Sequence, residues 1–296
     1  MKNIFYTFFL FLILGACSNG KETSYRPDKL LFGMAISVDN DQTYGKMKAF
    51  KDYLSKKLKM EVEIVQVTNG SAVIEAARAN KLHIATLGTF SYIVAKNKLD
   101  ISPIVMPVSR ESNDMQGYHS YIITPANSKL NNMDDVIDNL NKLTLAWAYP
   151  TSTSGHLIPK AYFQKVGIND EDFKDIMISE SHIASIFSVV SGKIDLAAVD
   201  SNILMNAIRI GSVNEGDFKI IWKSDPIPHG PIFVNNQLDK RFIKELQQAF
   251  IDLAIDDPKA ADDINFSGNY PLKYVAVNDS VYQPLTEVAK AVGLLQ

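Results

Sequence analysis

Short apolar stretches alternate with amphipathic ones through the first third of the chain. Strands are predicted at 30–36, 61–67 and 83–87, where apolar residues run together or alternate with polar ones. Helices are predicted between and after them; the clearest spans 44–58, where apolar residues recur at helical spacing. Repeated strand–helix alternation predicts a mainly parallel sheet flanked by helices, which binds ligands at the carboxyl ends of its strands.

The second third repeats this order without repeating the sequence. Strands are predicted at 143–148, 174–179 and 194–199, each followed by a polar turn and a helix. Residues 240–296 read as mostly helical. We therefore expect two lobes, each a mixed, mainly parallel sheet flanked by helices. The first lobe comprises residues 28–125 plus 223–296, and the second comprises residues 126–222.

The N-terminus is expected to lie outside this fold. Ile4 to Leu14 is an apolar run of eleven residues, which is too short to span a bilayer and typical of a signal peptide. The run closes in Leu14-Gly-Ala-Cys17, which resembles the bacterial lipobox. That resemblance implies a signal peptide over 1–16, a lipid on Cys17 and a tether over 17–27. An ordinary secretory signal with a chance cysteine is the alternative.

One polar turn of the second lobe has the composition of an oxyanion site. Ser152, Thr153, Ser154 and Gly155 lie between a predicted strand and a helix that contains Pro159 in its first turn. Amides at a helix N-terminus have no internal partners and carry partial positive charge, so hydroxyls and amides here suit an anion. Ser and Thr are also ordinary N-caps, and a plain helix cap is the alternative.

Composition limits the remaining classes of function. The net charge is -3, and no basic stripe indicates binding to nucleic acid. The five histidines lack metal-ligand spacing such as His-Glu-x-x-His, and Thr151 stands where a nucleophile elbow needs glycine. No glycine-rich cofactor loop is present, so we expect no cofactor, no metal and no enzymatic activity.

The ordered motifs resemble those of the phosphate, phosphite and phosphonate substrate-binding proteins of bacterial ABC importers. The resemblance covers roughly residues 28–290, and it implies a two-lobed type II periplasmic-binding-protein clamshell that catches its ligand between α/β lobes. The motifs that carry it are Tyr44, Gly88-Thr-Phe-Ser-Tyr92, Tyr118-x-Ser120, Ser152-Thr-Ser-Gly155 with Pro159, Ser181-His182 and Gly192-Lys-x-Asp195.

The resemblance also implies binding residues. Ser152, Thr153 and Ser154 match residues that wrap the anion, and Gly155 completes that turn. Tyr44 and Tyr92 match phenols that reach across from the first lobe, with ordinary core or rim aromatics as the alternative. His182 matches a histidine at a helix start. Ser120 and Asp200 are weaker candidates, and a plain cap of the next helix is the alternative for Asp200.

One motif departs from the family. Phosphonate-binding members carry an acid in the crossover motif Ser-x-x-Ile-Pro-x-Asp-Pro, whereas this chain has Gly230 at that position, within Ser224 to Pro231. The departure favours phosphate, phosphite or a simple alkylphosphonate over an aminophosphonate.

The resemblance implies partners and a location as well. We expect a monomer anchored to the bilayer through Cys17, with its folded body in the periplasm or extracytoplasmic space, delivering ligand to an ABC permease and its ATPase. Two alternatives stay open. The clamshell can signal to a membrane kinase or cyclase, or it can resemble relatives that make a thiamine pyrimidine precursor from lysine-bound pyridoxal phosphate.

Overall fold

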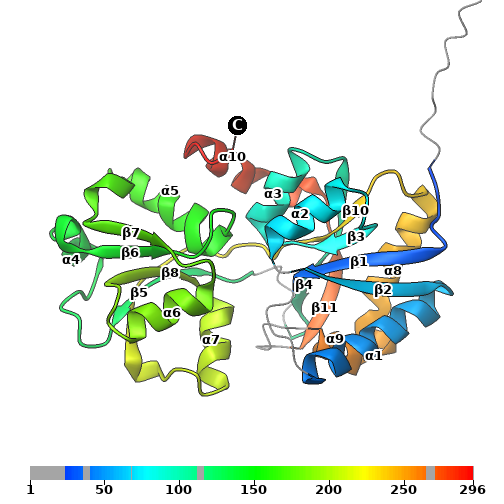
Figure 1. The fold of residues 1–296 in the computed structure, drawn as a ribbon, viewed down its shortest axis with the longest axis horizontal. Helices are drawn as coiled ribbons and strands as arrows, with labels where there is room; N and C mark the ends of the chain where they lie inside the picture. The colour runs from blue at the N-terminus through cyan, green and yellow to red at the C-terminus, as the bar shows by residue number, and fades with distance from the viewer. Residues whose placement is uncertain (1–23, 36–40, 68, 112–116, 265–270, 296) are drawn as a thin grey trace, which may run out of the picture.

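The computed structural model describes residues 24–35, 41–67, 69–111, 117–264 and 271–295, with the side chains of residues 35 and 41–44 excepted. Two separate sheets, each covered by helices, form two lobes side by side (Figure 1). The chain passes between the lobes twice, once before β5 and once after β9. None of the helices in these ranges is long and apolar enough to cross a membrane.

The first lobe has a six-stranded sheet in the order β11-β4-β10-β3-β1-β2. β1 pairs in parallel with β2 and β3, whereas β10 is antiparallel to both β3 and β4. The strands are β1 (Lys29–Ala35), β2 (Glu61–Val67), β3 (Ile84–Thr86), β4 (Ile101–Ser109), β10 (Ile232–Asn235) and β11 (Leu272–Ala276). The helices are α1 (Asp41–Leu58), α2 (Gly70–Arg78), α3 (Thr89–Lys96), α8 (Lys240–Asp256), α9 (Pro258–Asp263) and α10 (Gln283–Ala291).

The second lobe has a five-stranded sheet in the order β7-β6-β8-β5-β9. β7, β6 and β8 run parallel, and β5 is antiparallel to both β8 and β9. The strands are β5 (Ser120–Pro125), β6 (Thr144–Trp147), β7 (Asp175–Ile178), β8 (Leu196–Asp200) and β9 (Phe218–Lys223). The helices are α4 (Met133–Ile137), α5 (Ile158–Lys165), α6 (His182–Val190) and α7 (Ser201–Arg209).

Two details correct the expectations from sequence. The lobe bounds expected from sequence place residues 120–125 in the first lobe, but these residues form β5, which pairs with β8 and β9 and so belongs to the second sheet. The chain therefore crosses before residue 120, not after 125. Residues 272–276 form the strand β11 within the region expected to be mostly helical, because this short stretch pairs with the long edge of β4.

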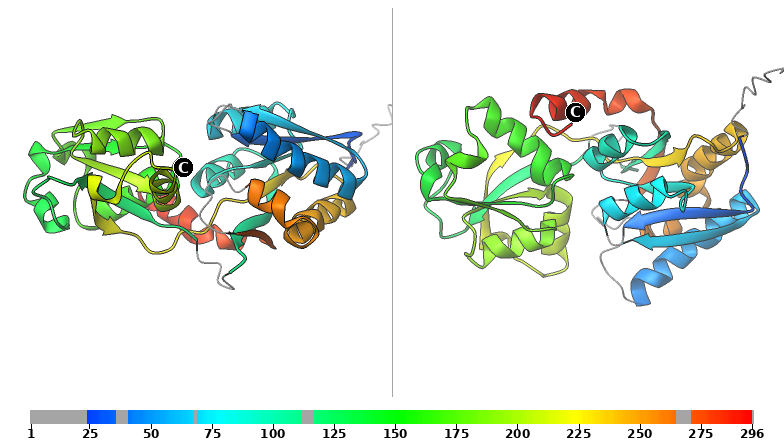
Figure 2. Two further views of the ribbon diagram at one scale, coloured as in Figure 1. Left: turned by 90° about the horizontal axis from the view of Figure 1, so that it is seen from below. Right: turned by 45° about the horizontal axis from the view of Figure 1, so that its top comes forward.

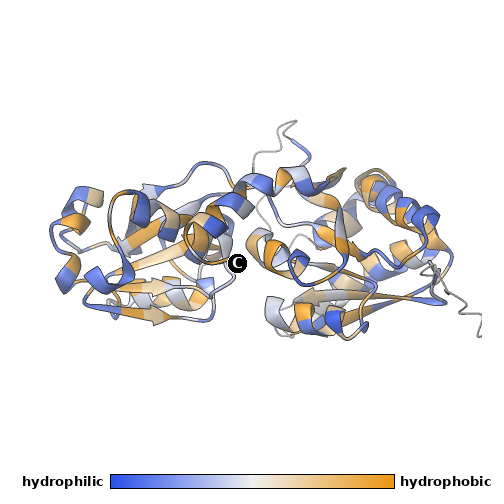
Figure 3. Ribbon diagram, turned by 90° about the horizontal axis from the view of Figure 1, so that it is seen from above, coloured by the Kyte–Doolittle hydropathy of each residue, from blue (hydrophilic) through white to orange (hydrophobic). Residues whose placement is uncertain are grey.

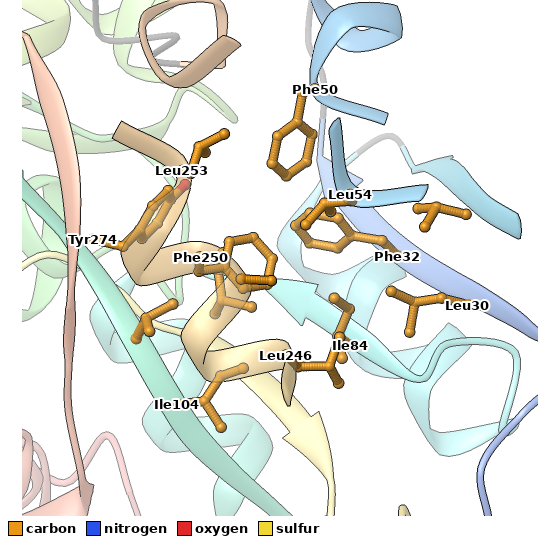
Figure 4. Close-up of a cluster of buried hydrophobic side chains, with 14 of the residues drawn as sticks. Leu30, Phe32, Phe50, Leu54, Ile84, Ile104, Leu246, Phe250, Leu253 and Tyr274 are labelled. Carbon is orange, nitrogen blue, oxygen red and sulfur yellow. The ribbon is translucent and has the colours of Figure 1, made fainter. Parts of the chain in front are cut away.

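Apolar residues on both faces of each sheet form the core of each lobe. One cluster of the first lobe joins β1 to α1 and α8, where the rings of Phe32, Phe50 and Phe250 meet with centroids 5.8–6.0 Å apart (Figure 4). Aromatic pairs at such distances stabilise a core beyond their area burial. Figure 3 shows the matching pattern on the ribbon, where many helices are hydrophobic along one side and hydrophilic along the other.

A second cluster of the first lobe extends across the junction between the lobes. It includes Leu157, which precedes α5 of the second lobe, together with Leu285 of α10. It also includes Tyr118 and Ile227, one from each crossover. The C-terminal helix α10 consequently lies over the junction and contacts both α3 and α5 (Figure 2).

Candidate oxyanion site

The hydroxyl turn follows β6 as the sequence predicts, but its helix begins earlier and with a wider turn than expected. Residues Thr153–Leu157 form a π-helical turn, closed by a bond from the Leu157 amide to the Ser152 carbonyl oxygen (3.0 Å), and α5 begins at Ile158. The Ser152 hydroxyl caps the turn by accepting from the Gly155 amide at 2.9 Å. Within the described part of the chain, the amides of Thr153 and Ser154 have no partner. They are donors available to an anion.

Gly155 is required by close packing. A Cβ atom added to it would lie 2.5 Å from Ala148 Cβ, 2.7 Å from His182 Cε1 and 2.9 Å from Ser152 Oγ. Real side chains do not approach one another so closely, and glycine therefore lets the turn close onto His182.

His182 is held as a neutral donor. It begins α6 directly after the capping residue Ser181, and its Nδ1 accepts from the Asp200 amide at 3.1 Å. That bond leaves the proton on Nε2, which lies 3.1 Å from Ser152 Oγ and donates to it. Burial lowers the pKa of His182 to about 4, so the imidazole is uncharged near neutral pH.

Asp200 is the carboxylate of the cluster. It ends β8 and caps α7, where its Oδ1 accepts from the amides of Asn202 (2.7 Å) and Ile203 (3.2 Å). The nearby Ser154 hydroxyl acts with these amides to lower the pKa of the carboxyl. Burial nevertheless raises the pKa of Asp200 to about 7, since these bonds only partly offset the loss of hydration.

Two tyrosines that the sequence did not single out as ligand residues complete the cluster. The phenol of Tyr118 contacts the hydroxyls of Thr153 and Ser154, and its ring stacks on His229 with centroids 5.3 Å apart. The ring of Tyr149 meets His182 edge-on at 5.6 Å. Burial raises the pKa of both phenols, which therefore remain protonated donors. The Tyr118-x-Ser120 motif contains the relevant signal, although the resemblance points to its serine.

The first lobe meets the turn through the N-terminus of α3. The Phe90 amide donates to Thr153 Oγ1 at 2.9 Å, and the Ser91 hydroxyl donates to the carbonyl oxygen of Thr151 at 3.1 Å. Ser120 supports the turn from its own lobe by donating to the Ser154 carbonyl oxygen at 2.6 Å. The turn thus lies at the contact between the lobes.

The family model for the periplasmic phosphonate substrate-binding protein of ABC transporters matches residues 32–282. The chain belongs to this family. It is 27% identical over 212 residues to the phosphonates-binding periplasmic protein of Escherichia coli K12, covering 71% of this chain and 62% of that relative, which is under two thirds of the relative's length. It is 28% identical over 229 residues to the phosphate-import protein PhnD of Mycolicibacterium smegmatis, covering 73% of this chain and 69% of the relative.

Solved structures confirm the expected periplasmic-binding-protein fold. The PhnD1 protein of Prochlorococcus marinus, solved in complex with methylphosphonate, superposes with a TM-score of 0.76 at 21% identity, covering 91% of this chain and all of that one (100%). A binding protein component of an ABC phosphonate transporter from Pseudomonas aeruginosa gives 0.76 at 22% identity, covering 90% and 86%. The family consists of transport proteins, not enzymes.

One of the predicted site residues does not join the cluster. Tyr92 is 1% exposed, donates to Asp279 Oδ1 at 2.6 Å and packs against Tyr282, so its phenol points into the first lobe and not across to the second. This contradicts its expected position. Tyr44 belongs to α1, but its side chain lies outside the described residues, as does Cys17.

The missing acid of this family member has a steric explanation. A Cβ atom on Gly230 would lie 1.8 Å from the Leu87 carbonyl oxygen and 2.7 Å from Gly88 Cα. The neighbouring Pro228 carbonyl oxygen accepts from Thr89 Oγ1 at 2.6 Å, which holds the second crossover against the start of α3. No side chain fits at residue 230 in this arrangement.

Among the described residues, no cluster of acidic, histidine or cysteine side chains suits a metal ion.

Proposed function

We propose that this protein captures a small phosphorus oxyanion at the contact between its lobes and delivers it to an ABC permease. The observation that carries the proposal is the turn from Ser152 to Gly155, which offers two unpartnered amides and three hydroxyls at a helix N-terminus. Such groups bind an anion without a counter-charge and release it again. Closing the lobes around the ligand gives the permease a signal that the site is loaded.

The chemistry of the cluster limits the ligand. It offers hydroxyl and amide donors from Thr153, Ser154 and Tyr118, and one carboxylate, Asp200; His182 holds the Ser152 hydroxyl beside them. An aminoalkylphosphonate needs acids for its ammonium group, and Gly230 cannot be replaced by one without displacing backbone. We therefore propose phosphate, phosphite or a simple alkylphosphonate. The names of the relatives mention phosphonates, phosphate and phosphite, which supports this class.

Titration calorimetry of the purified protein with phosphate, phosphite and methylphosphonate tests the proposal. Ser154→Ala should lower the affinity for the ligand about tenfold to a hundredfold, because one hydrogen bond to a charged group contributes ~1.5–3 kcal/mol. Ser191→Ala is the matched control, since that exposed serine lies at the opposite end of α6 from the site. Absence of binding to all three anions would refute the proposal.

We also propose that Cys17 is lipidated and anchors the protein to the membrane. The support is the sequence alone, in which the apolar run ends in Leu-Gly-Ala-Cys. The wild-type protein should incorporate labelled palmitate and sediment with membranes, whereas Cys17→Ala should do neither. Incorporation of label into the variant would contradict the assignment.

A further inference from the structure

The phenol of Tyr118 reaches the hydroxyl turn from the first crossover. Tyr118 lies two residues before β5, and the hydroxyls of Thr153 and Ser154 are close enough to act on the pKa of its phenol. A tyrosine side chain turns about two bonds, so the contacts around its ring decide where its hydroxyl points. The second crossover supplies one of these contacts.

The two crossovers are bonded to each other at Tyr118. Its amide donates to the Ile227 carbonyl oxygen at 3.0 Å, and the Ile227 amide donates to the Tyr118 carbonyl oxygen at 2.7 Å. The residue before Tyr118 is a glycine, and a Cβ atom on Gly117 would lie only 1.5 Å from that Ile227 oxygen. This bridge fixes the backbone of Tyr118 and leaves the direction of its ring to side-chain contacts.

His229 of the second crossover gives the Tyr118 ring a flat face to pack against. The imidazole stacks on that ring with centroids 5.3 Å apart and an angle of 25° between the ring planes. Offset stacking at this distance is a favourable arrangement of two rings. Burial lowers the pKa of His229 to about 4, so near neutral pH the imidazole is an uncharged ring and not a counter-charge for a bound anion.

His229 is itself attached to the first lobe. Its carbonyl oxygen accepts from the hydroxyl of Tyr282 at 3.2 Å, and Tyr282, the residue before α10, is 2% exposed. On one side of His229, the Pro228 carbonyl oxygen accepts from Thr89 Oγ1 at 2.6 Å. On the other side, Gly230 packs against the backbone that leads into α3. The imidazole is therefore fixed to the first lobe, whereas the hydroxyl turn belongs to the second.

We infer that His229 is a positioning residue, which holds the phenol of Tyr118 at the hydroxyl turn and so makes it a ready donor to the anion. The inference rests on the proposed function and adds a residue that raises affinity through another side chain. Because the stack joins a residue fixed to the first lobe to a donor at the turn of the second, the phenol is in place only while the two crossovers stay stacked.

Calorimetry of the purified protein tests the inference, with whichever of phosphate, phosphite and methylphosphonate the wild-type protein binds most tightly. Tyr118→Phe keeps the ring and removes the hydroxyl, and it should lower affinity about tenfold or more. His229→Ala removes the flat face and should lower affinity about fivefold to tenfold, because the ring must then be ordered again on binding. His229→Phe supplies a flat face without ring nitrogens and should restore affinity to within about twofold of wild type.

The double variant Tyr118→Phe/His229→Ala separates positioning from direct contact. Since His229 acts through the phenol, the double variant should bind within about twofold of Tyr118→Phe alone. His83→Ala is the matched control for lost stability. It removes a half-buried imidazole that lies edge-on to Tyr25, with centroids 6.1 Å apart, and accepts from the Leu31 amide at 2.9 Å. This variant should lower Tm and keep the wild-type affinity.

Three results would overturn the inference and leave the proposed function intact. These are wild-type affinity in His229→Ala, a failure of His229→Phe to restore affinity, and the full His229→Ala loss in the Tyr118→Phe background. If His229→Ala does not fold, His229→Leu replaces it, because leucine fills the space without a flat face and should show the same loss. If the wild-type protein binds none of the three anions, the proposed function fails and the inference falls with it.

Discussion

Replacing Gly230 by alanine should separate the second crossover from the start of α3. The added Cβ would lie 1.8 Å from the carbonyl oxygen of Leu87 and 2.7 Å from Gly88 Cα. Both are backbone atoms, so no side-chain rotation relieves the overlap, and the crossover must move by more than an ångström.

That movement breaks two hydrogen bonds, from Thr89 Oγ1 to the Pro228 carbonyl oxygen (2.6 Å) and from the Leu87 amide to the Pro231 carbonyl oxygen (3.3 Å). Each contributes ~1 kcal/mol net to the free energy of unfolding, and overpacking adds ~1–3 kcal/mol. We expect a loss of about 3–5 kcal/mol. A domain of this size loses ~2–4 °C of Tm per kcal/mol, so Tm should fall by roughly 6–20 °C.

The site should weaken with the fold, because the displaced helix also supplies the Phe90 amide that bonds to Thr153. Thermal unfolding followed by circular dichroism measures the first effect, and calorimetry with methylphosphonate measures the second, which we expect to exceed tenfold. Gly216→Ala is the control, since no atom lies within 4 Å of its added Cβ. Wild-type Tm and affinity in Gly230→Ala would refute the steric explanation.

Two further substitutions test the positions of buried polar groups. Tyr92→Phe should lower the free energy of unfolding by about 1 kcal/mol through the lost bond to Asp279. It should change ligand affinity less than twofold, and a tenfold loss of affinity would show that the phenol contacts the ligand after all. His182→Gln should make the free energy of unfolding less dependent on pH below about 6.5. Because the pKa of His182 is lowered in the folded protein, the unfolded chain binds more protons between pH 6.5 and about 4. The free energy of unfolding of the wild-type protein therefore decreases as the pH is lowered through that window, by at most about 3 kcal/mol. Urea unfolding at pH 4.5 and 7.5 measures the difference, and equal pH dependence in both proteins would contradict the buried neutral imidazole.

The sequence was sufficient for most of the order of elements, though not for β11, and for the hydroxyl turn after β6. Apolar periodicity is a local property, and the strand at 144–147 followed by three hydroxyl residues and a proline leaves few alternatives to a strand, a turn and a helix start. Pairing between strands is not local. Nothing within 120–125 indicates that it pairs with β8 and β9 of the second lobe.

Side-chain direction was the other information that the sequence lacked. Tyr92 and Tyr118 are both buried tyrosines close to turns, but helix α3 directs the first into its own lobe, and the crossover directs the second to Thr153 and Ser154. The loss of an acid at Gly230 was visible from the sequence. Its cause, a backbone contact with Leu87, depends on tertiary packing.

The apolar contact between the two lobes has a calorimetric consequence. Leu157 ends the π-helical turn Thr153–Leu157 and lies in one cluster with Leu285 of α10, Tyr118 and Ile227. If the lobes rotate apart, this surface meets water, and it is buried again when they close. Ligand binding to an open form is then accompanied by a negative change in heat capacity, whereas binding to lobes that are already in contact changes the heat capacity little. The temperature dependence of the binding enthalpy therefore reports which form of the free protein predominates.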